Sequence, residues 1–235
     1  MVVAVVGGRE EQGSFNRGYQ AKRQPGSSIK PLLDYGPALN EGVITPSTEY
    51  TDEKITIDGY TPKNSNNKYI GQVTVREALA RSINTIAVQL YQATGKSKCM
   101  SYLEDMEFSS LVYADSTAMS LSVGGFTQGV TVEDMTKGYA MIANGGKYSE
   151  NTCIRSLSSY DEGVVYECNS VKDKEVFTED AAFMLTDMMQ GTFKEDYGTA
   201  HDWDTDIQVY AGKTGTTNDN KDAWFCGFSS YYTTA

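Results

Sequence analysis

RQPGSSIKP, residues 23–31, is the most informative stretch of the sequence, because it places two serines directly after a turn signal. The dipeptide Pro25-Gly26 is typical of turns, so a new element is predicted to begin at Ser27. If that element is a helix, Lys30 lies one turn after Ser27 on the same face. A hydroxyl and an amine in this arrangement can be a nucleophile and its base, or two ordinary surface residues.

The composition is that of a globular chain. The 235 residues are 40% hydrophobic, which is enough to bury a core in one domain or in a compact two-lobed unit. The net charge is −11 and no basic patch stands out, which argues against nucleic acid as a partner. No apolar run reaches the roughly 18 residues of a membrane span. The opening MVVAVVGGRE lacks the basic region of a signal peptide, and we interpret Val2–Val6 as a strand.

The four cysteines, Cys99, Cys153, Cys168 and Cys226, form no Cys-x-x-Cys pair, and His201 is the only histidine, so no zinc site is predicted. Residues 153–168, CIRSLSSYDEGVVYEC, predict two strands around a turn at residues 161–163. Cys153 and Cys168 could form a disulfide across this hairpin in an oxidising compartment, or remain two free thiols. We expect Cys99 and Cys226 to be small buried hydrophobic residues.

Residues 74–95, TVREALARSINTIAVQLYQATG, carry a helical pattern. Thr74 and Glu77 have the spacing of a capping box, and Gly95 is a stop signal. The polar residues 81–84, RSIN, interrupt the apolar face. We therefore predict two helices with a short break between them.

The rest of the chain is predicted to be mixed in structure. Residues 9–26 and 40–72 are expected to be loop and extended chain. Further helices are predicted over residues 132–145, after Thr131, and over residues 179–191, after Thr178. The Met and Phe stripe of the second is interpreted as core packing. Strands are predicted over residues 207–217 and 223–230, which gives an α+β plan.

Three short polar motifs interrupt this scaffold: SSIK at residues 27–30, SIN at 82–84 and KTGT at 213–216. Each motif alone is a weak signal, since a serine and a lysine three apart occur by chance in many proteins. Together, in this order and each at an element boundary, they match the serine-lysine, serine-asparagine and lysine-threonine-glycine set of penicillin-binding proteins and class A β-lactamases.

The surrounding sequence extends the match over essentially the whole chain. The segments that carry it are FNRGYQAKRQPGSSIKP, YTPKN, VTVREALARSIN, GGFTQGVTVEDM, YAMIANGG and AGKTGTTNDNKDAWFCGFS. The chain resembles the transpeptidase domain of bifunctional, or class A, penicillin-binding proteins. The resemblance implies one domain over residues 1–235, with an antiparallel sheet flanked by helices and an all-helical subdomain. The first and last strands of the family's five-stranded sheet are expected to be missing, as in a fragment of a longer protein.

Chemistry explains why these residue types are needed. A serine hydroxyl such as that of Ser27 is a poor nucleophile until a base takes its proton. Lys30 can be that base only when neutral, so burial and a second cation, Lys213, are expected to lower its pKa. The backbone N–H groups of Ser27 and Thr216 would form an oxyanion hole. Gly215 would keep the strand edge free of a side chain, so that a substrate can lie close.

The resemblance implies roles for the remaining motif residues. Ser82 would relay the proton toward the leaving amine, and Asn84 would hold the amide on the acyl side of the substrate. Lys213, with the hydroxyls of Thr214 and Thr216, would bind the terminal carboxylate of the substrate.

The implied reaction is a two-step acyl transfer. Ser27 would attack the D-Ala-D-Ala bond of a peptidoglycan stem peptide, and the amine of a second stem would then take the acyl group. β-Lactams would acylate the same serine, and no metal or organic cofactor is required. The resemblance further implies a parent protein anchored on the outer face of the cytoplasmic membrane, with a glycosyltransferase domain.

Two other functions remain open from the sequence. A D,D-carboxypeptidase or β-lactamase-type hydrolase would use water in place of the amine. However, the Glu-x-x-Leu-Asn stretch of class A β-lactamases is absent between the second and third motifs. The other hypothesis is a non-catalytic penicillin-binding fragment. The presence of Ser27, Lys30 and Lys213 argues against it.

Overall fold

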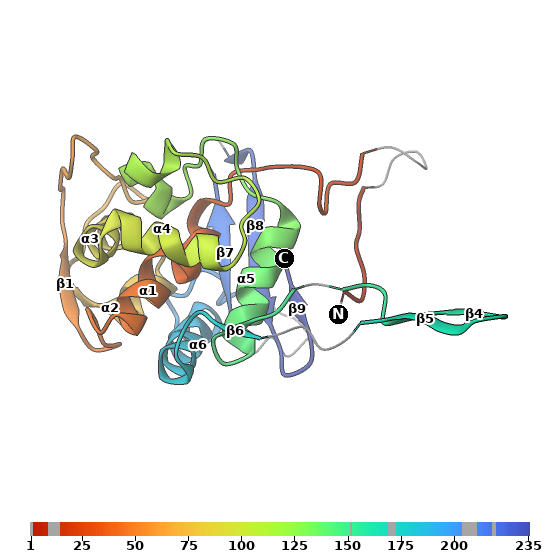
Figure 1. The fold of residues 1–235 in the computed structure, drawn as a ribbon. Helices are drawn as coiled ribbons and strands as arrows, with labels where there is room; N and C mark the ends of the chain where they lie inside the picture. The colour runs from red at the N-terminus through yellow and green to blue at the C-terminus, as the bar shows by residue number, and fades with distance from the viewer. Residues whose placement is uncertain (1, 9–14, 151, 169–172, 204–210, 218–219) are drawn as a thin grey trace.

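The computed structural model places a cluster of helices beside a small antiparallel sheet (Figure 1). It describes residues 2–8, 15–150, 152–168, 173–203, 211–217 and 220–235. The helices are η1 Gly26–Ile29, η2 Pro31–Tyr35, α1 Gly36–Asn40, α2 Val75–Ala80, α3 Asn84–Thr94, α4 Lys96–Asp105, η3 Asp115–Thr117, η4 Met119–Val123, α5 Val132–Ala143 and α6 Glu179–Lys194. The strands are β1 Glu49–Asp52, β2 Gly71–Thr74, β3 Lys147–Tyr148, β4 Ser156–Ser159, β5 Gly163–Glu167, β6 Lys174–Glu175, β7 Ala211–Thr216, β8 Ala223–Phe228 and β9 Thr233–Thr234. This arrangement confirms the predicted α+β class.

A helical path begins at Gly26, one residue before the predicted start at Ser27, but it is not a regular α-helix. It starts as the 3-10 turn η1, continues as the π-helical η2 and ends as α1. Pro31 has no N–H to donate, and the N–H of Gly36 bonds to the Pro31 carbonyl five residues back, which is the π-helical pattern.

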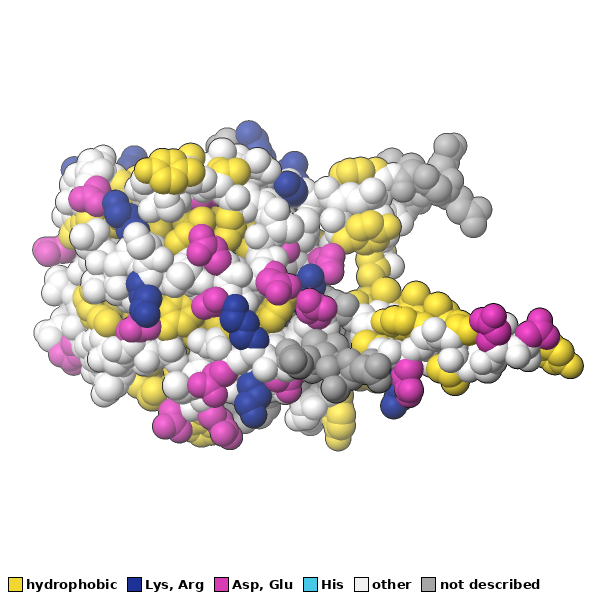
Figure 2. All heavy atoms as spheres, in the orientation of Figure 1, with side chains coloured by type: hydrophobic (Ala, Val, Ile, Leu, Met, Phe, Trp, Pro, Cys, Tyr) yellow, Lys and Arg dark blue, Asp and Glu magenta, His cyan; other side chains and the backbone are white. Residues whose placement is uncertain are grey.

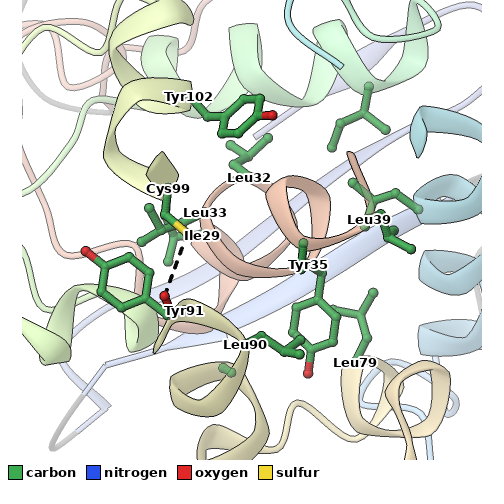
Figure 3. Packing of buried hydrophobic residues seen from close by; sticks show 14 of the residues in the cluster. Ile29, Leu32, Leu33, Tyr35, Leu39, Leu79, Leu90, Tyr91, Cys99 and Tyr102 are labelled. Carbon is green, nitrogen blue, oxygen red and sulfur yellow. Dashed lines mark hydrogen bonds between the residues drawn. The ribbon is translucent and has the colours of Figure 1, made fainter. Parts of the chain in front are cut away.

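This path runs through the middle of the hydrophobic core (Figure 3). Its side chains Ile29, Leu32 and Leu33 are fully buried. The labelled residues around them come from α2, α3 and α4, and they include Leu79, Leu90, Tyr91, Cys99 and Tyr102. Burial of the whole face fixes the direction of the path, so the residues at its start are held rigidly.

The predicted break between α2 and α3 is confirmed. Residues 81–83 form a tight turn. Ser82 in this turn has a φ of 60°, in the left-handed region that residues with a side chain rarely adopt. The capping box predicted at the start of α2 is only half present. Thr74 accepts the N–H of Glu77, but the Glu77 carboxylate pairs with Arg81 instead of turning back to Thr74.

The starts of α5 and α6 are as predicted. Thr131 and Asp134 form a complete capping box at α5, and Thr178 accepts the N–H of Ala181 at α6. Helix α6 extends past the predicted end to Lys194. Its Met188 and Met189 are fully buried, as predicted for the Met and Phe stripe, but Phe183 is exposed, so the prediction of core packing is wrong for that residue.

The sheet beside the site consists of β7, β8 and β9 in that order, all antiparallel. The pairing of β7 with β8 confirms the two strands predicted near the C-terminal end, although residues 207–210 of the first prediction lie outside the described residues. The predicted strand at Val2–Val6 is wrong. Within the described residues no strand pairs with this segment, and its N–H contact is from Val2 to the Thr152 carbonyl.

The hairpin predicted over residues 153–168 is confirmed as β4 and β5. Figures 1 and 2 show it projecting as an arm that carries hydrophobic side chains, with acidic residues near its end. Cys168 donates its N–H to the Arg155 carbonyl, so its cross-strand neighbour is Arg155 and not Cys153. Both hairpin cysteines are free thiols in the structure, while Cys99 and Cys226 are fully buried as predicted.

The long region between α1 and α2 is mostly loop, as predicted, with one small sheet that the sequence did not indicate. Strands β1 and β2 pair in register from Glu49–Thr74 to Asp52–Gly71. Among the described helices, none combines the length and apolar character that crossing a bilayer requires.

Candidate active site

Two adjacent serines at the start of η1 differ sharply in their surroundings. The hydroxyl of Ser28 is fully buried and donates to the Pro25 carbonyl at 2.7 Å. Ser27 is only partly buried. Within the described part of the chain the hydroxyl of Ser27 makes no hydrogen bond, so it is the serine that can meet a substrate.

Lys30 is fully buried, with its ammonium group directed at the turn between α2 and α3. Its Nζ lies 2.8 Å from the Ser82 carbonyl oxygen, 3.3 Å from Ser82 Oγ and 2.7 Å from Asn84 Oδ1. Burial lowers the pKa of Lys30 to about 7, against the opposing effect of the nearby Asp34 carboxylate. The first and second motifs are thus in direct contact.

These contacts can be made by the charged amine or by the neutral one. A neutral lysine has two N–H donors and one lone pair. The Ser82 carbonyl and the Asn84 side-chain oxygen can only accept, so they use both donors and leave the lone pair for a hydroxyl. The Asn84 orientation is set by its Nδ2, which donates to the Lys63 carbonyl at 2.7 Å.

A buried polar network supports Asn84 from behind. Its backbone N–H donates to Asn64 Oδ1 at 2.9 Å, and Asn64 Nδ2 donates to Asp52 Oδ1 at 2.8 Å. The hydroxyl of Thr85 donates to the same Asp52 oxygen. Neither Asn64 nor Asp52 was predicted from the sequence as a site residue. The sequence signal for Asn64 is the YTPKN segment that contains it.

Lys213, in β7, is a second fully buried cation. Its Nζ donates to the Thr214 carbonyl at 3.0 Å. Burial lowers the pKa of Lys213 well below its usual range, and the charge of Lys30 lowers it further. The first motif thus acts electrostatically on the third, but the predicted effect of Lys213 on the pKa of Lys30 is not borne out, because burial is what lowers the pKa of Lys30 and Asp34 opposes it.

Strand β7 packs tightly against η1, and glycines make that contact possible. A Cβ on Gly215 would lie 2.5 Å from the Pro25 oxygen and 2.8 Å from the Ser28 nitrogen. A Cβ on Gly26 would lie 2.7 Å from the Thr216 carbonyl oxygen. From the sequence, Gly215 was predicted to leave space for a substrate. In the structure, the space that a side chain would fill belongs to the chain's own backbone.

The two threonines of the third motif are accessible. Thr216 is exposed at the end of β7, and Thr214 is partly buried. Thr214 Oγ1 lies 2.6 Å from Thr199 Oγ1, a residue of the segment that follows α6. Because β7 is an edge strand of its sheet, both threonines border a face that an extended chain can approach.

Asp34 is the one member of this region whose chemistry is unexpected. It is fully buried beneath the site, and neither carboxylate oxygen has a hydrogen-bond partner among the described residues. Burial raises the pKa of Asp34 well above its usual range, while the charge of Lys30 opposes that rise. Asp34 was not predicted as a site residue, and its signal in the sequence is a lone acid inside the apolar run PLLDYG.

The assembled site can therefore do nucleophilic chemistry. It offers an accessible serine, a buried amine whose pKa is near neutrality, a second hydroxyl on that amine, and a glycine-lined contact that places a strand edge beside the serine. Every predicted site residue lies in this region. Ser27, however, makes no direct hydrogen bond to Lys30 in the structure.

Comparisons with known proteins agree with this geometry. The family described as the penicillin binding protein transpeptidase domain matches residues 2–234. The chain is 37% identical over 233 residues to penicillin-binding protein 4 of Bacillus subtilis, covering 99% of the chain and 37% of that protein. It is 35% identical over 247 residues to penicillin-binding protein 1A of Clostridium botulinum, covering all of the chain and 30% of that protein.

Solved structures show the same likeness. The crystal structure of penicillin-binding protein 1A from Haemophilus influenzae superimposes with a TM-score of 0.81 at 27% identity, covering 95% of this chain and 39% of that one. The chain thus spans about a third of the length of the curated relatives it matches.

Proposed function

The chain belongs to the family of penicillin-binding protein transpeptidase domains, and we propose that it is a serine acyltransferase that crosslinks peptidoglycan. Its substrate would be the D-Ala-D-Ala end of a stem peptide, and β-lactams would acylate the same site. The observation that carries this proposal is the fully buried Lys30, whose amine contacts both Ser82 and Asn84 and has a pKa near 7.

In the first step Ser27 Oγ attacks the carbonyl of the scissile D-Ala-D-Ala bond. Lys30, about half neutral at pH 7 and mostly neutral above it, takes the hydroxyl proton, and a new C–O bond forms. The N–H groups of Ser27 and Thr216 would hold the oxyanion, an assignment that the close packing of η1 on β7 supports.

Collapse of the intermediate breaks the C–N bond and releases D-Ala. Its nitrogen needs a proton, and Ser82 is the group that can pass one from Lys30, since its hydroxyl lies 3.3 Å from Lys30 Nζ. In the second step the amine of another stem peptide attacks the acyl-enzyme. The proton path runs in reverse, and Ser27 is regenerated.

Substrate binding falls to the second and third motifs. The terminal carboxylate is an acceptor-only anion, and Lys213 with the hydroxyls of Thr214 and Thr216 supplies donors at the edge of β7. Asn84 holds the amide on the acyl side. An extended stem peptide can lie along β7, because one edge of that strand pairs with no other strand among the described residues.

The substrate also sets the place of action. Peptidoglycan is crosslinked outside the cytoplasmic membrane, so we propose that the parent protein works on its outer face. A membrane anchor and a glycosyltransferase domain in the parent protein belong to the same proposal. The reaction as written uses side chains and backbone N–H groups alone, without a cofactor.

A fluorescent penicillin tests the proposal on the chain as it stands. We expect a label that survives a denaturing gel, persists over a time course and is lost in Ser27→Ala. Ser28→Ala is the matched control. That hydroxyl is buried on the Pro25 carbonyl, so the variant should keep the label. A label that appears and then vanishes would identify a hydrolase instead, and an unlabelled wild type would refute the acyltransferase assignment.

A further inference from the structure

The segment that follows α6 contacts both the second and the third motif, and Thr199 makes one contact on each side. The Thr199 backbone N–H donates to the Ala80 carbonyl at 3.3 Å, directly before the turn that carries Ser82. The Thr199 side chain lies on β7, with Oγ1 2.6 Å from Thr214 Oγ1. None of the three motifs includes this residue.

The position of Thr199 is fixed by its neighbours along the chain. A Cβ on Gly198 would lie 2.4 Å from the Thr192 carbonyl oxygen, so this glycine packs directly on the end of α6. Ala200 is buried, and its N–H donates to the same carbonyl at 3.0 Å. The side chain of Thr199 therefore stands on a rigid support although its hydroxyl is exposed.

A second contact holds this segment to the end of α2. The guanidinium carbon of Arg81 lies 4.1 Å above the ring of Tyr197, which is a cation–π geometry. Arg81 immediately precedes Ser82. The segment at 197–200 is thus attached on one side to the Ser82 turn and on the other to Thr214.

The hydroxyl pair has a direct consequence for anion binding. A threonine hydroxyl has one donor and rotates freely unless a neighbour fixes it. If Thr199 donates to Thr214 Oγ1, the Thr214 proton is left to point away from that bond and toward a bound carboxylate. Chains of hydrogen bonds of this kind polarise one another and strengthen the final donor.

We propose that Thr199 is a positioning residue for recognition of the substrate's terminal carboxylate, acting by orienting the Thr214 hydroxyl. The inference rests on the proposed function, since it names a further residue of the same carboxylate subsite. It predicts that Thr199 discriminates between substrates that carry the carboxylate and analogues in which that group is blocked.

The test compares the acylation rates of benzylpenicillin and its methyl ester, measured from the mass of the intact protein over time. Thr199→Val keeps the shape and removes the hydroxyl. It should slow the carboxylate form by up to about tenfold, the upper size of one hydrogen bond between neutral groups, and leave the ester nearly unchanged. Thr199→Ser keeps the hydroxyl and should retain the wild-type ratio between the two compounds.

Thr56→Val is the matched control, because Thr56 and Thr61 form another exposed hydroxyl pair at 2.7 Å outside the three motifs. This variant should leave both rates unchanged. An equal loss on both compounds in Thr199→Val, or no loss on either, would overturn the inference. A wild type that reacts with neither compound would refute the proposed function itself, and the Thr199 role with it, so the two failures are distinguishable.

Discussion

Lys30 Nζ lies 2.7 Å from Asn84 Oδ1, although 54 residues separate the two along the chain. The contact joins the helical path that begins at Gly26 to the start of α3, and Lys30 is fully buried where they meet. A lysine in such a place resists protonation, because burial disfavours its charged form. From this relationship follow expectations about pH, strain, packing and the buried acid.

The rate of acylation by penicillin should rise with pH and level off above about 7, where Lys30 becomes neutral. Below that value the fraction of neutral amine, and with it the rate, should fall about tenfold per pH unit. Lys30→Ala should lower the rate by roughly 10²- to 10⁴-fold and remove this dependence. Rates measured from pH 5 to 9 with both proteins decide the matter. A wild-type profile that stays flat through pH 7 would contradict the role of Lys30.

The turn residue Ser82 should show opposite effects on activity and stability. Its φ of 60° is strained for a residue with a side chain, and glycine relieves that strain. The free energy of unfolding of Ser82→Gly should therefore be about 1 kcal/mol higher than that of Ser82→Ala. Both variants lack the hydroxyl, so both should label slowly with penicillin. Thermal melts and a labelling time course on the same samples measure the two effects, and equal melting temperatures would argue against strain at this turn.

The packing of β7 on η1 should not tolerate a methyl group at Gly215. The added Cβ would meet the Pro25 oxygen at 2.5 Å, so strand or helical turn must move. We expect Gly215→Ala to lose about 2 kcal/mol of stability, as over-packed sites do, and to label poorly.

Gly59→Ala provides the comparison for Gly215→Ala. Gly59 has a φ of 78°, in the left-handed region, and a Cβ there meets nothing within 4 Å. It should lose about 1 kcal/mol from backbone strain and label normally. Normal labelling of both variants would mean that the close approach of β7 to η1 is not needed for the site.

Replacement of Asp34 by Asn should affect both stability and the rate profile. The folded state raises the pKa of Asp34, so above about pH 4 it holds a proton that the unfolded chain has released. Wild-type stability is therefore lost as pH rises from about 4 toward the folded pKa, and Asp34→Asn removes this loss. Denaturant melts should show the variant gaining on the wild type between pH 4.5 and 8.

The same substitution should lower the pKa of Lys30 to the extent that Asp34 is ionised near pH 7, because only an ionised Asp34 raises that pKa against burial. The rise of the acylation rate would then occur at lower pH than in the wild type. An unchanged rise would show that Asp34 keeps its proton through that pH range.

Much of this architecture could be predicted from local sequence signals. Thr131 with Asp134, and Thr178 before acidic residues, define helix starts through bonds made within one turn. The polar residues RSIN interrupt the apolar face locally, and they mark the break between α2 and α3. The three motifs could be found because each combines unusual residue types at an element boundary.

What could not be predicted depends on tertiary contacts. Val2–Val6 has the composition of a strand, but a strand exists only when a neighbour supplies its hydrogen bonds. The irregular path after Gly26 results from Pro31 inside a buried helix. The reason for Gly215 lies in Pro25 and Ser28, which are close to it only in the folded chain. Thr199 carries no motif, and its value comes from its distance to Thr214.

The most direct measurement is the position of the covalent bond formed with penicillin. The labelled protein is digested, and the peptide containing residues 24–30 is fragmented in a mass spectrometer to assign the adduct to one side chain. The account predicts the penicilloyl group on Ser27, with none on the buried Ser28. An adduct on Ser28 or outside this peptide, or a protein that remains unmodified, would contradict it.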